Sequence, residues 1–129
     1  MIFTNCKYAC PRNIGNIQDI ENGLPVNIKN QIRYTLVSFD VDRDTVARLK
    51  QFAHDMALDS NWTLLSGDEE EVRELSMLLD VNFEKVENGD FNHTVIITIL
   101  DQNGIIVYRH EGLAIEPREE IQKIVSIAK

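Results

Sequence analysis

The chain has 129 residues, of which 43% are hydrophobic and 26% charged, so it is long enough for one domain with a buried core. Its formal net charge is -8, and its lysine and arginine residues form neither a run nor a basic stripe among aromatic residues, which argues against a nucleic-acid-binding protein. The longest apolar stretch, residues 95–100, is far too short to span a bilayer, and no signal peptide opens the sequence. We therefore predict one globular domain over residues 1–129, with no targeting signal in this chain.

The first half of the chain is predicted to alternate strands with helices. Residues 1–4 are apolar enough to end a buried strand, and residues 33–39 form a second strand rich in β-branched and aromatic side chains. A helix that ends near Gly23 lies between them, with Pro11 in its first turn. Its apolar face is marked by Ile14, Ile17, Ile20 and Leu24, at helical spacing. A second helix follows the polar loop 40–44, capped by Asp44 or Thr45.

The second half continues the same alternation. Residues 62–65 form a short strand, and Asp68 caps a helix that runs through Leu79. Residues 95–100 and 105–108 form a hairpin around a tight turn, and a last helix starts near Pro117. This order predicts an α/β domain of the thioredoxin-like class, with a central mixed sheet flanked by helices.

The two cysteines, Cys6 and Cys10, lie where the first strand opens into the first helix. Their spacing of four places both sulfur atoms on one side of the helix start, where they could form a disulfide or share one metal ion. The partial positive charge of the helix N-terminus favours thiolate over thiol, so we expect lowered cysteine pKa values.

Two other interpretations of the cysteines stay open. A static disulfide, or a pair of inert buried thiols, would be purely structural, but a disulfide that closes so short a loop stabilises a fold only weakly. A structural zinc site requires four protein ligands, and the chain offers three histidines and no further cysteine.

His93 is the candidate third ligand. It precedes the strand 95–100, at a position that faces the cysteine loop in a thioredoxin-like sheet, so its imidazole could complete a site with two thiolates. Soft thiolates select Cu(I), and an added imidazole makes Cu(II) acceptable. The alternative is an exposed or capping histidine, and His54 and His110 have that appearance. The prolines of this sequence are Pro11, Pro25 and Pro117. General disulfide reductases have a cis-proline just before this strand, and that feature is absent here.

The acidic loop at Asp40, Asp42 and Asp44 lacks the glycine and the final glutamate of a calcium-binding EF-hand loop. A helix-capping turn explains the acidic side chains of this loop, but a role beside a metal site is also open. Asp40 and Asp44 are candidates to orient a metal ligand by hydrogen bonding.

Taken together, these motifs resemble the Sco/SenC family. That family carries a Cys-x-x-x-Cys-Pro motif, here residues 6–11, and an Asp-Pro-x-x-Asp-Thr loop, here residues 40–45 with Val41 in place of the proline. It also carries a distant histidine, here His93 between an asparagine and a threonine. The resemblance covers nearly the whole chain.

The resemblance implies a thioredoxin-like fold and copper bound by Cys6, Cys10 and His93. It also implies delivery of copper, or reduction of thiols, during cytochrome c oxidase assembly. The expected partners are the copper-site subunit of the oxidase or another copper protein, together with a thiol reductant. The expected location is the periplasm, or a membrane anchor that faces outside the cytoplasm. Family members begin with additional strands before the cysteine motif, so we expect this chain to lack the N-terminal part of the domain.

The sequence therefore favours a copper-binding metallochaperone. The alternative is a thiol-disulfide oxidoreductase that acts on the copper-site cysteines of partner proteins, with Cys6 attacking and Cys10 resolving. A redox sensor would use the same two cysteines.

Overall fold

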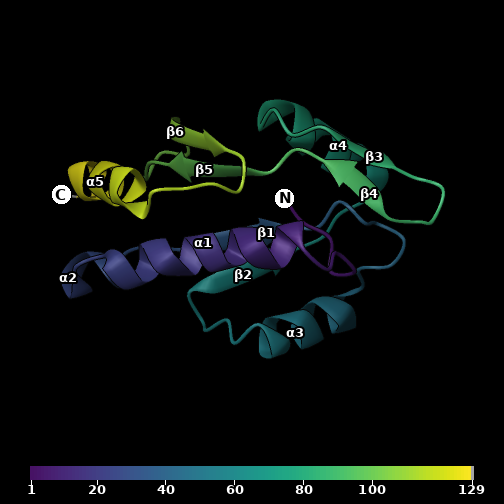
Figure 1. Ribbon diagram of the computed structural model, residues 1–129, viewed down its shortest axis with the longest axis horizontal. Helices are drawn as coiled ribbons and strands as arrows, with labels where there is room; N and C mark the ends of the chain where they lie inside the picture. The colour runs from purple at the N-terminus through teal and green to yellow at the C-terminus, as the bar shows by residue number, and fades with distance from the viewer. Residues whose placement is uncertain (129) are drawn as a thin grey trace.

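Three parallel segments meet at the centre of the computed structural model, which describes residues 1–128 (Figure 1). Strand β1 (Tyr34–Val37) pairs with β2 (Trp62–Leu65). On the other side of β1, Ile2 forms a parallel bridge with Ser38. The backbone N–H of Ile2 donates to the carbonyl of Val37 at 2.9 Å. The predicted strands at 33–39 and 62–65 are thus confirmed, and the first residues take the predicted place of a buried strand end.

Helix α1 (Ala9–Gly23) lies across this group of strands and is followed by the short helix α2 (Val26–Lys29) (Figure 1). Ile14 and Ile20 are buried because the apolar residues of α1 recur at helical spacing. The helix ends at Gly23, where Leu24 turns to an extended conformation and Pro25 follows.

Side chains that the sequence marks as caps begin the next two helices. The hydroxyl of Thr45 accepts a hydrogen bond from the backbone N–H of Arg48 at the start of α3 (Val46–Asp55). The carboxylate of Asp68 does the same for α4 (Glu69–Leu78), whose first turn carries three glutamates that favour the positive end of the helix dipole. Of the two residues proposed to cap α3, the cap is therefore Thr45, which leaves Asp44 free for other contacts.

The C-terminal part contains two antiparallel hairpins and a helix. Strand β3 (Phe83–Lys85) pairs with β4 (Phe91–His93), and β5 (Ile96–Leu100) pairs with β6 (Ile106–Glu111). The predicted turn before β6 is confirmed, with Gly104 at φ +80°, a conformation that favours glycine. Helix α5 (Pro117–Ile127) begins at the predicted proline and lies beside the C-terminal half of α1 (Figure 1).

The sheet differs in detail from the expected continuous one. In residues 1–128 the strands form three separate two-stranded sheets, and the hairpin of β3 and β4 was not predicted at all. Its strands have three residues each, too few to show a period of two. Side-chain packing connects the sheets. For example, the ring of Phe39, just after β1, stacks on Phe83 of β3 with centroids 4.8 Å apart.

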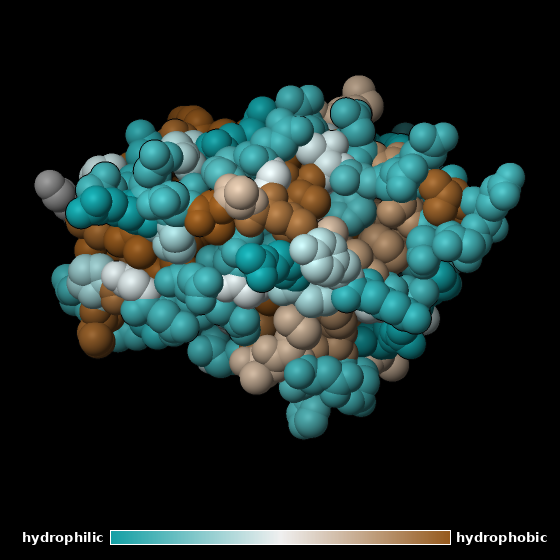
Figure 2. Space-filling view, in the orientation of Figure 1, coloured by the Kyte–Doolittle hydropathy of each residue, from teal (hydrophilic) through white to brown (hydrophobic). Residues whose placement is uncertain are grey.

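Two apolar clusters form the core. The first lies under the cysteine loop and contains Phe3, Phe39 and Phe83. The second joins α1 to α5 through Ile20 and Ile124. The face of the molecule seen in Figure 2 is mainly hydrophilic, with hydrophobic side chains in scattered patches. Within the described residues, none of the helices has both the length and the apolar character that a membrane crossing requires.

Candidate metal centre

The structure brings Cys6, Cys10 and His93 together. Cys6 lies in the loop before α1, Cys10 is the second residue of α1, and His93 ends β4. The Cys10 sulfur is 3.7 Å from Nε2 of His93, and the backbone N–H of Cys10 donates to the Cys6 sulfur at 3.3 Å. The two Sγ atoms and a ring nitrogen of His93 all lie within 4.8 Å of one another. Three donor atoms this close can share one ion.

The imidazole of His93 is held in one tautomer. Its Nδ1 lies 3.0 Å from the carbonyl oxygen of Thr94, which can only accept, so Nδ1 carries the proton. Nε2 is therefore left with its lone pair directed at Cys10. Burial lowers the pKa of His93, so the ring is neutral at pH 7. A neutral imidazole fixed by a backbone carbonyl is the form in which histidine binds metals.

Aromatic rings surround the histidine on its inner side. The ring of Phe3 meets the imidazole edge to face, with centroids 5.7 Å apart, and the ring of Phe39 lies 5.1 Å away. Phe91, two residues before His93, packs against both of these rings. The apolar packing fixes the ring plane and keeps water from that side of the site.

The two thiols are in different environments. Cys10 is 1% exposed, whereas Cys6 is partly exposed, and both are free thiols. Burial raises the pKa of Cys10 to about 12, and the hydrogen bond with the backbone of Phe3 offsets only part of this effect. The expected lowering of the pKa by the helix N-terminus is therefore wrong for Cys10. The N–H in the first turn of α1 instead points at the sulfur of Cys6.

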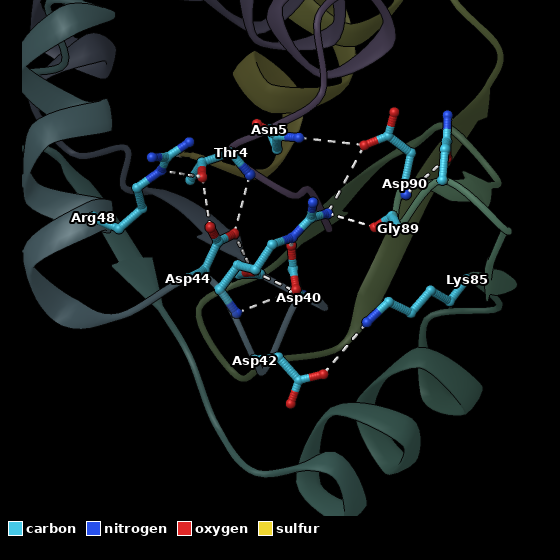
Figure 3. Close-up of polar contacts among 12 residues, drawn as sticks. Thr4, Asn5, Asp40, Asp42, Asp44, Arg48, Lys85, Gly89 and Asp90 are labelled. Carbon is cyan, nitrogen blue, oxygen red and sulfur yellow. Dashed lines mark hydrogen bonds and ion pairs between the residues drawn. The ribbon is translucent and has the colours of Figure 1, made fainter.

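The acidic loop supports the cysteine loop from below (Figure 3). The buried carboxylate of Asp44 accepts hydrogen bonds from both the backbone N–H and the hydroxyl of Thr4, and from the hydroxyl of Ser38. In residues 1–128 neither Asp40 nor Asp44 hydrogen-bonds to Cys6, Cys10 or His93. Asp44 contacts the cysteine loop through Thr4, and the roles of Asp40 and Asp44 in orienting a ligand stay predictions.

Arg43 connects the acidic loop to the hairpin that carries His93. Its guanidinium pairs with Asp40 and donates to the carbonyl of Gly89 at 2.7 Å. Asp90, which follows Gly89, accepts from the side chain of Asn5 at 3.3 Å, next to Cys6 (Figure 3). The loop before Cys6 and the loop before β4 are thus tied to one polar network, which the sequence did not reveal, because its members are separated by up to 85 positions.

Several proteins with solved structures are similar to this chain. A family model described as SCO1/SenC matches residues 1–129. A SCO1/SenC family lipoprotein from Bacillus anthracis has a solved structure that is 27% identical, with a TM-score of 0.84 over 98% of this chain and 77% of that one. ScoI from Bradyrhizobium japonicum, solved with copper bound, is 25% identical, with a TM-score of 0.79 over 97% of this chain and 80% of that one.

Yeast Sco1 shares the fold at 23% identity, with a TM-score of 0.75 over 96% of this chain and 77% of its own. No curated protein sequence matches the chain closely enough to count as a relative. The thioredoxin-like α/β fold expected from the sequence is thereby confirmed.

Proposed function

Because the chain belongs to the SCO1/SenC family, we propose that it is a copper-binding metallochaperone that delivers copper during the assembly of cytochrome c oxidase. The ligands in this proposal are the sulfur atoms of Cys6 and Cys10 and Nε2 of His93. The observation that carries it is the mutual approach of these three donors within 4.8 Å, from two segments more than 80 positions apart.

The donor set suits copper. Two thiolates select a soft cation such as Cu(I), and the imidazole also accommodates Cu(II). The cluster contains three donors, whereas a structural zinc site is closed by four. Copper bound to the Bradyrhizobium japonicum protein, 25% identical over nearly this whole chain, supports the same cargo here.

The unequal exposure of the ligands suits transfer. Cys6 is partly exposed, so a thiolate of a recipient protein can replace its sulfur on the ion first. Cys10 and His93 hold the ion from the buried side until the recipient supplies further ligands. We propose that the recipient is the copper-site subunit of the oxidase or another copper protein. By family, the location is periplasmic or anchored to a membrane outside the cytoplasm.

A Cu(I) affinity measurement on the reduced protein tests the proposal. We expect one copper ion per chain, with a loss of at least a hundredfold in affinity for His93→Ala and for Cys10→Ser. His54→Ala is the matched control, because His54 is an exposed histidine whose side chain is 85% accessible. Unchanged affinity in His93→Ala would remove the histidine from the site and with it the three-ligand proposal.

A second candidate function is thiol-disulfide exchange, favoured by two free thiols of unequal exposure. The Cys6 thiolate would attack a partner disulfide and form a mixed disulfide, releasing one partner thiolate. Cys10 would then lose its proton and attack the Cys6 sulfur, releasing the second partner thiolate and closing a Cys6–Cys10 disulfide. Two electrons pass to the partner, and a thiol reductant must restore the pair.

The exchange rate with a disulfide substrate separates the two functions. Oxidoreductase activity requires Cys6, so Cys6→Ser should abolish exchange, while His93→Ala should leave the rate nearly unchanged. A chaperone without exchange activity would show no turnover in the unaltered protein. A redox sensor would use the same disulfide but would respond to an oxidant instead of a protein disulfide.

A further inference from the structure

A carboxylate without hydrogen bonds is buried where α5 meets α1. Glu120 of α5 is 1% exposed, and neither of its oxygens has a hydrogen-bond partner among residues 1–128. Asp40, equally buried, is paired with Arg43. Burying a carboxylate without donors costs folding free energy, so the protein gains from any cation that binds there.

Two polar groups of β6 face this carboxylate: the hydroxyl of Tyr108, which donates to Glu119 at 3.1 Å, and the ring of His110. Its Nδ1 lies 3.5 Å from Oε1 of Glu120, beyond the length of about 2.7–2.9 Å expected of a direct charge-assisted hydrogen bond. Its other nitrogen, Nε2, lies 2.8 Å from the carbonyl oxygen of Ala114. A carbonyl only accepts, so Nε2 carries a proton, and in the neutral ring the Nδ1 lone pair faces the carboxylate. Two acceptors then face each other with a gap between them.

The width of that gap matches a bound metal ion. Bonds of about 2.0–2.1 Å to nitrogen and oxygen at a tetrahedral angle separate the two donor atoms by about 3.3 Å. The backbone carbonyl behind Nε2 is the outer contact that typically orients a metal-binding histidine. The sequence suggested that His110 is an exposed or capping histidine. Its side chain is instead only 21% exposed and is directed at a buried carboxylate.

The two side chains line a surface pocket of about 590 Å³, where α1, α5 and the loop after β6 meet. The pocket is open to solvent on one side, so water can complete a coordination sphere. Among the described residues, its lining carries more acidic than basic side chains, with Asp19, Glu116 and Glu119 beside Glu120 against Arg12. The local charge therefore favours a cation.

We propose that His110 Nδ1 and the Glu120 carboxylate form a second metal site, for a divalent transition-metal cation such as Zn²⁺. One nitrogen and one carboxylate suit Zn²⁺, Ni²⁺ or Cu²⁺, and the lack of a thiolate gives Cu(I) no advantage. The site shares no residue with the cluster of Cys6, Cys10 and His93, so it does not depend on the proposed copper function.

The test is a calorimetric Zn²⁺ titration of the full chain carrying Cys6→Ser, Cys10→Ser and His93→Ala, which removes the first cluster. We expect one Zn²⁺ per chain, with affinity weakened at least tenfold by either His110→Ala or Glu120→Gln. The matched control is His54→Ala, because His54 Nδ1 also lies 3.5 Å from a carboxylate, that of Asp55, but both side chains are exposed. It should change the affinity by less than twofold.

Nitrogen-15 NMR of the unaltered chain provides a second readout. If the site exists, Zn²⁺ shifts the Nδ1 resonance of His110 and leaves Nε2 protonated. No Zn²⁺ uptake, or uptake that both site variants leave unchanged, overturns the proposal. So does a His110 ring that is an imidazolium at pH 7 and insensitive to Zn²⁺, because the pair is then only an ion pair.

Discussion

The carboxylate of Asp44 holds Thr4, two residues before Cys6, by accepting hydrogen bonds from both its backbone N–H and its hydroxyl. The two residues are 40 positions apart. Asp44 is buried and also accepts a hydrogen bond from Ser38, the residue that follows β1. It therefore connects the cysteine loop to the end of β1.

Asp44→Ala should therefore destabilise the fold and weaken copper binding together. The change leaves the two Thr4 donors and the Ser38 hydroxyl without their acceptor, a loss of about 1–3 kcal/mol in the free energy of unfolding. We expect Cu(I) affinity to fall about tenfold as the cysteine loop loosens. Urea denaturation and a Cu(I) competition assay measure the two effects.

Asp42→Ala is the control for Asp44. Asp42 belongs to the same loop but is exposed, and within residues 1–128 it pairs only with Lys85, at 3.5 Å. An exposed pair of this kind contributes about 0–1 kcal/mol, so stability and copper affinity should stay close to their original values. Equal effects of the two substitutions would show that Asp44 has no special role.

The thiol of Cys10 should resist alkylation well above neutral pH. Burial raises its pKa to about 12, so in the reduced, metal-free protein the unreactive thiol form dominates at every pH below that value. Iodoacetamide at pH 8, followed by mass spectrometry of peptides, should label Cys6 before Cys10. Labelling of Cys10 should increase as the pH approaches 12. Preferential labelling of Cys10 at pH 8 would contradict its burial.

The same shift links protonation of Cys10 to stability. The pKa is higher in the folded state than the ordinary value of 9.0, so folding favours the protonated thiol. The contribution is complete below pH 9 and is lost as the pH rises toward about 12. Cys10→Ala should flatten this part of the curve of unfolding free energy against pH, whereas an unchanged slope would assign it to other groups.

His93 should make the metal-free protein less stable in acid. Burial lowers its pKa below the ordinary value of 6.5, so the folded state favours the neutral ring. Stability from this source is present above pH 6.5 and is lost as the pH falls through the lowered folded-state pKa. His93→Gln should reduce the loss of stability in acid. If it has no effect on the acid limb, the imidazole does not titrate with unfolding.

Ile14 tests the packing beneath the site. It is fully buried in α1, one turn after Cys10, and belongs to the first apolar cluster, under the cysteine loop. Ile14→Ala should lower the free energy of unfolding by about 2–5 kcal/mol through lost burial and a cavity. Val26→Ala, at a side chain 76% exposed, is the control and should have little effect. Thermal unfolding followed by circular dichroism compares them.

Local sequence patterns predicted most of the fold. Helical spacing of apolar residues placed α1, and capping residues placed the starts of α3 and α4. The short hairpin of β3 and β4 was missed, because three-residue strands carry no readable period. The division of the expected sheet into pairs depends on packing between distant rings such as Phe39 and Phe83, which no local pattern encodes.

The proximity of Cys6, Cys10 and His93 was predictable, but the environment of these side chains was not. The spacing of Cys6 and Cys10 at a helix start, together with the family resemblance, led to His93. The raised pKa of Cys10 was not predictable, because it depends on the chain that covers its sulfur. The links from Arg43 to Gly89 and from Asn5 to Asp90 were equally hidden, since nothing in either local sequence marks its partner.

X-ray absorption spectroscopy of the Cu(I)-loaded protein tests most directly whether the three side chains share one ion. The account predicts a first shell of two sulfur atoms and one nitrogen for each copper, with the nitrogen contribution lost in His93→Ala. A first shell of sulfur alone, or a nitrogen signal that persists in His93→Ala, would contradict it.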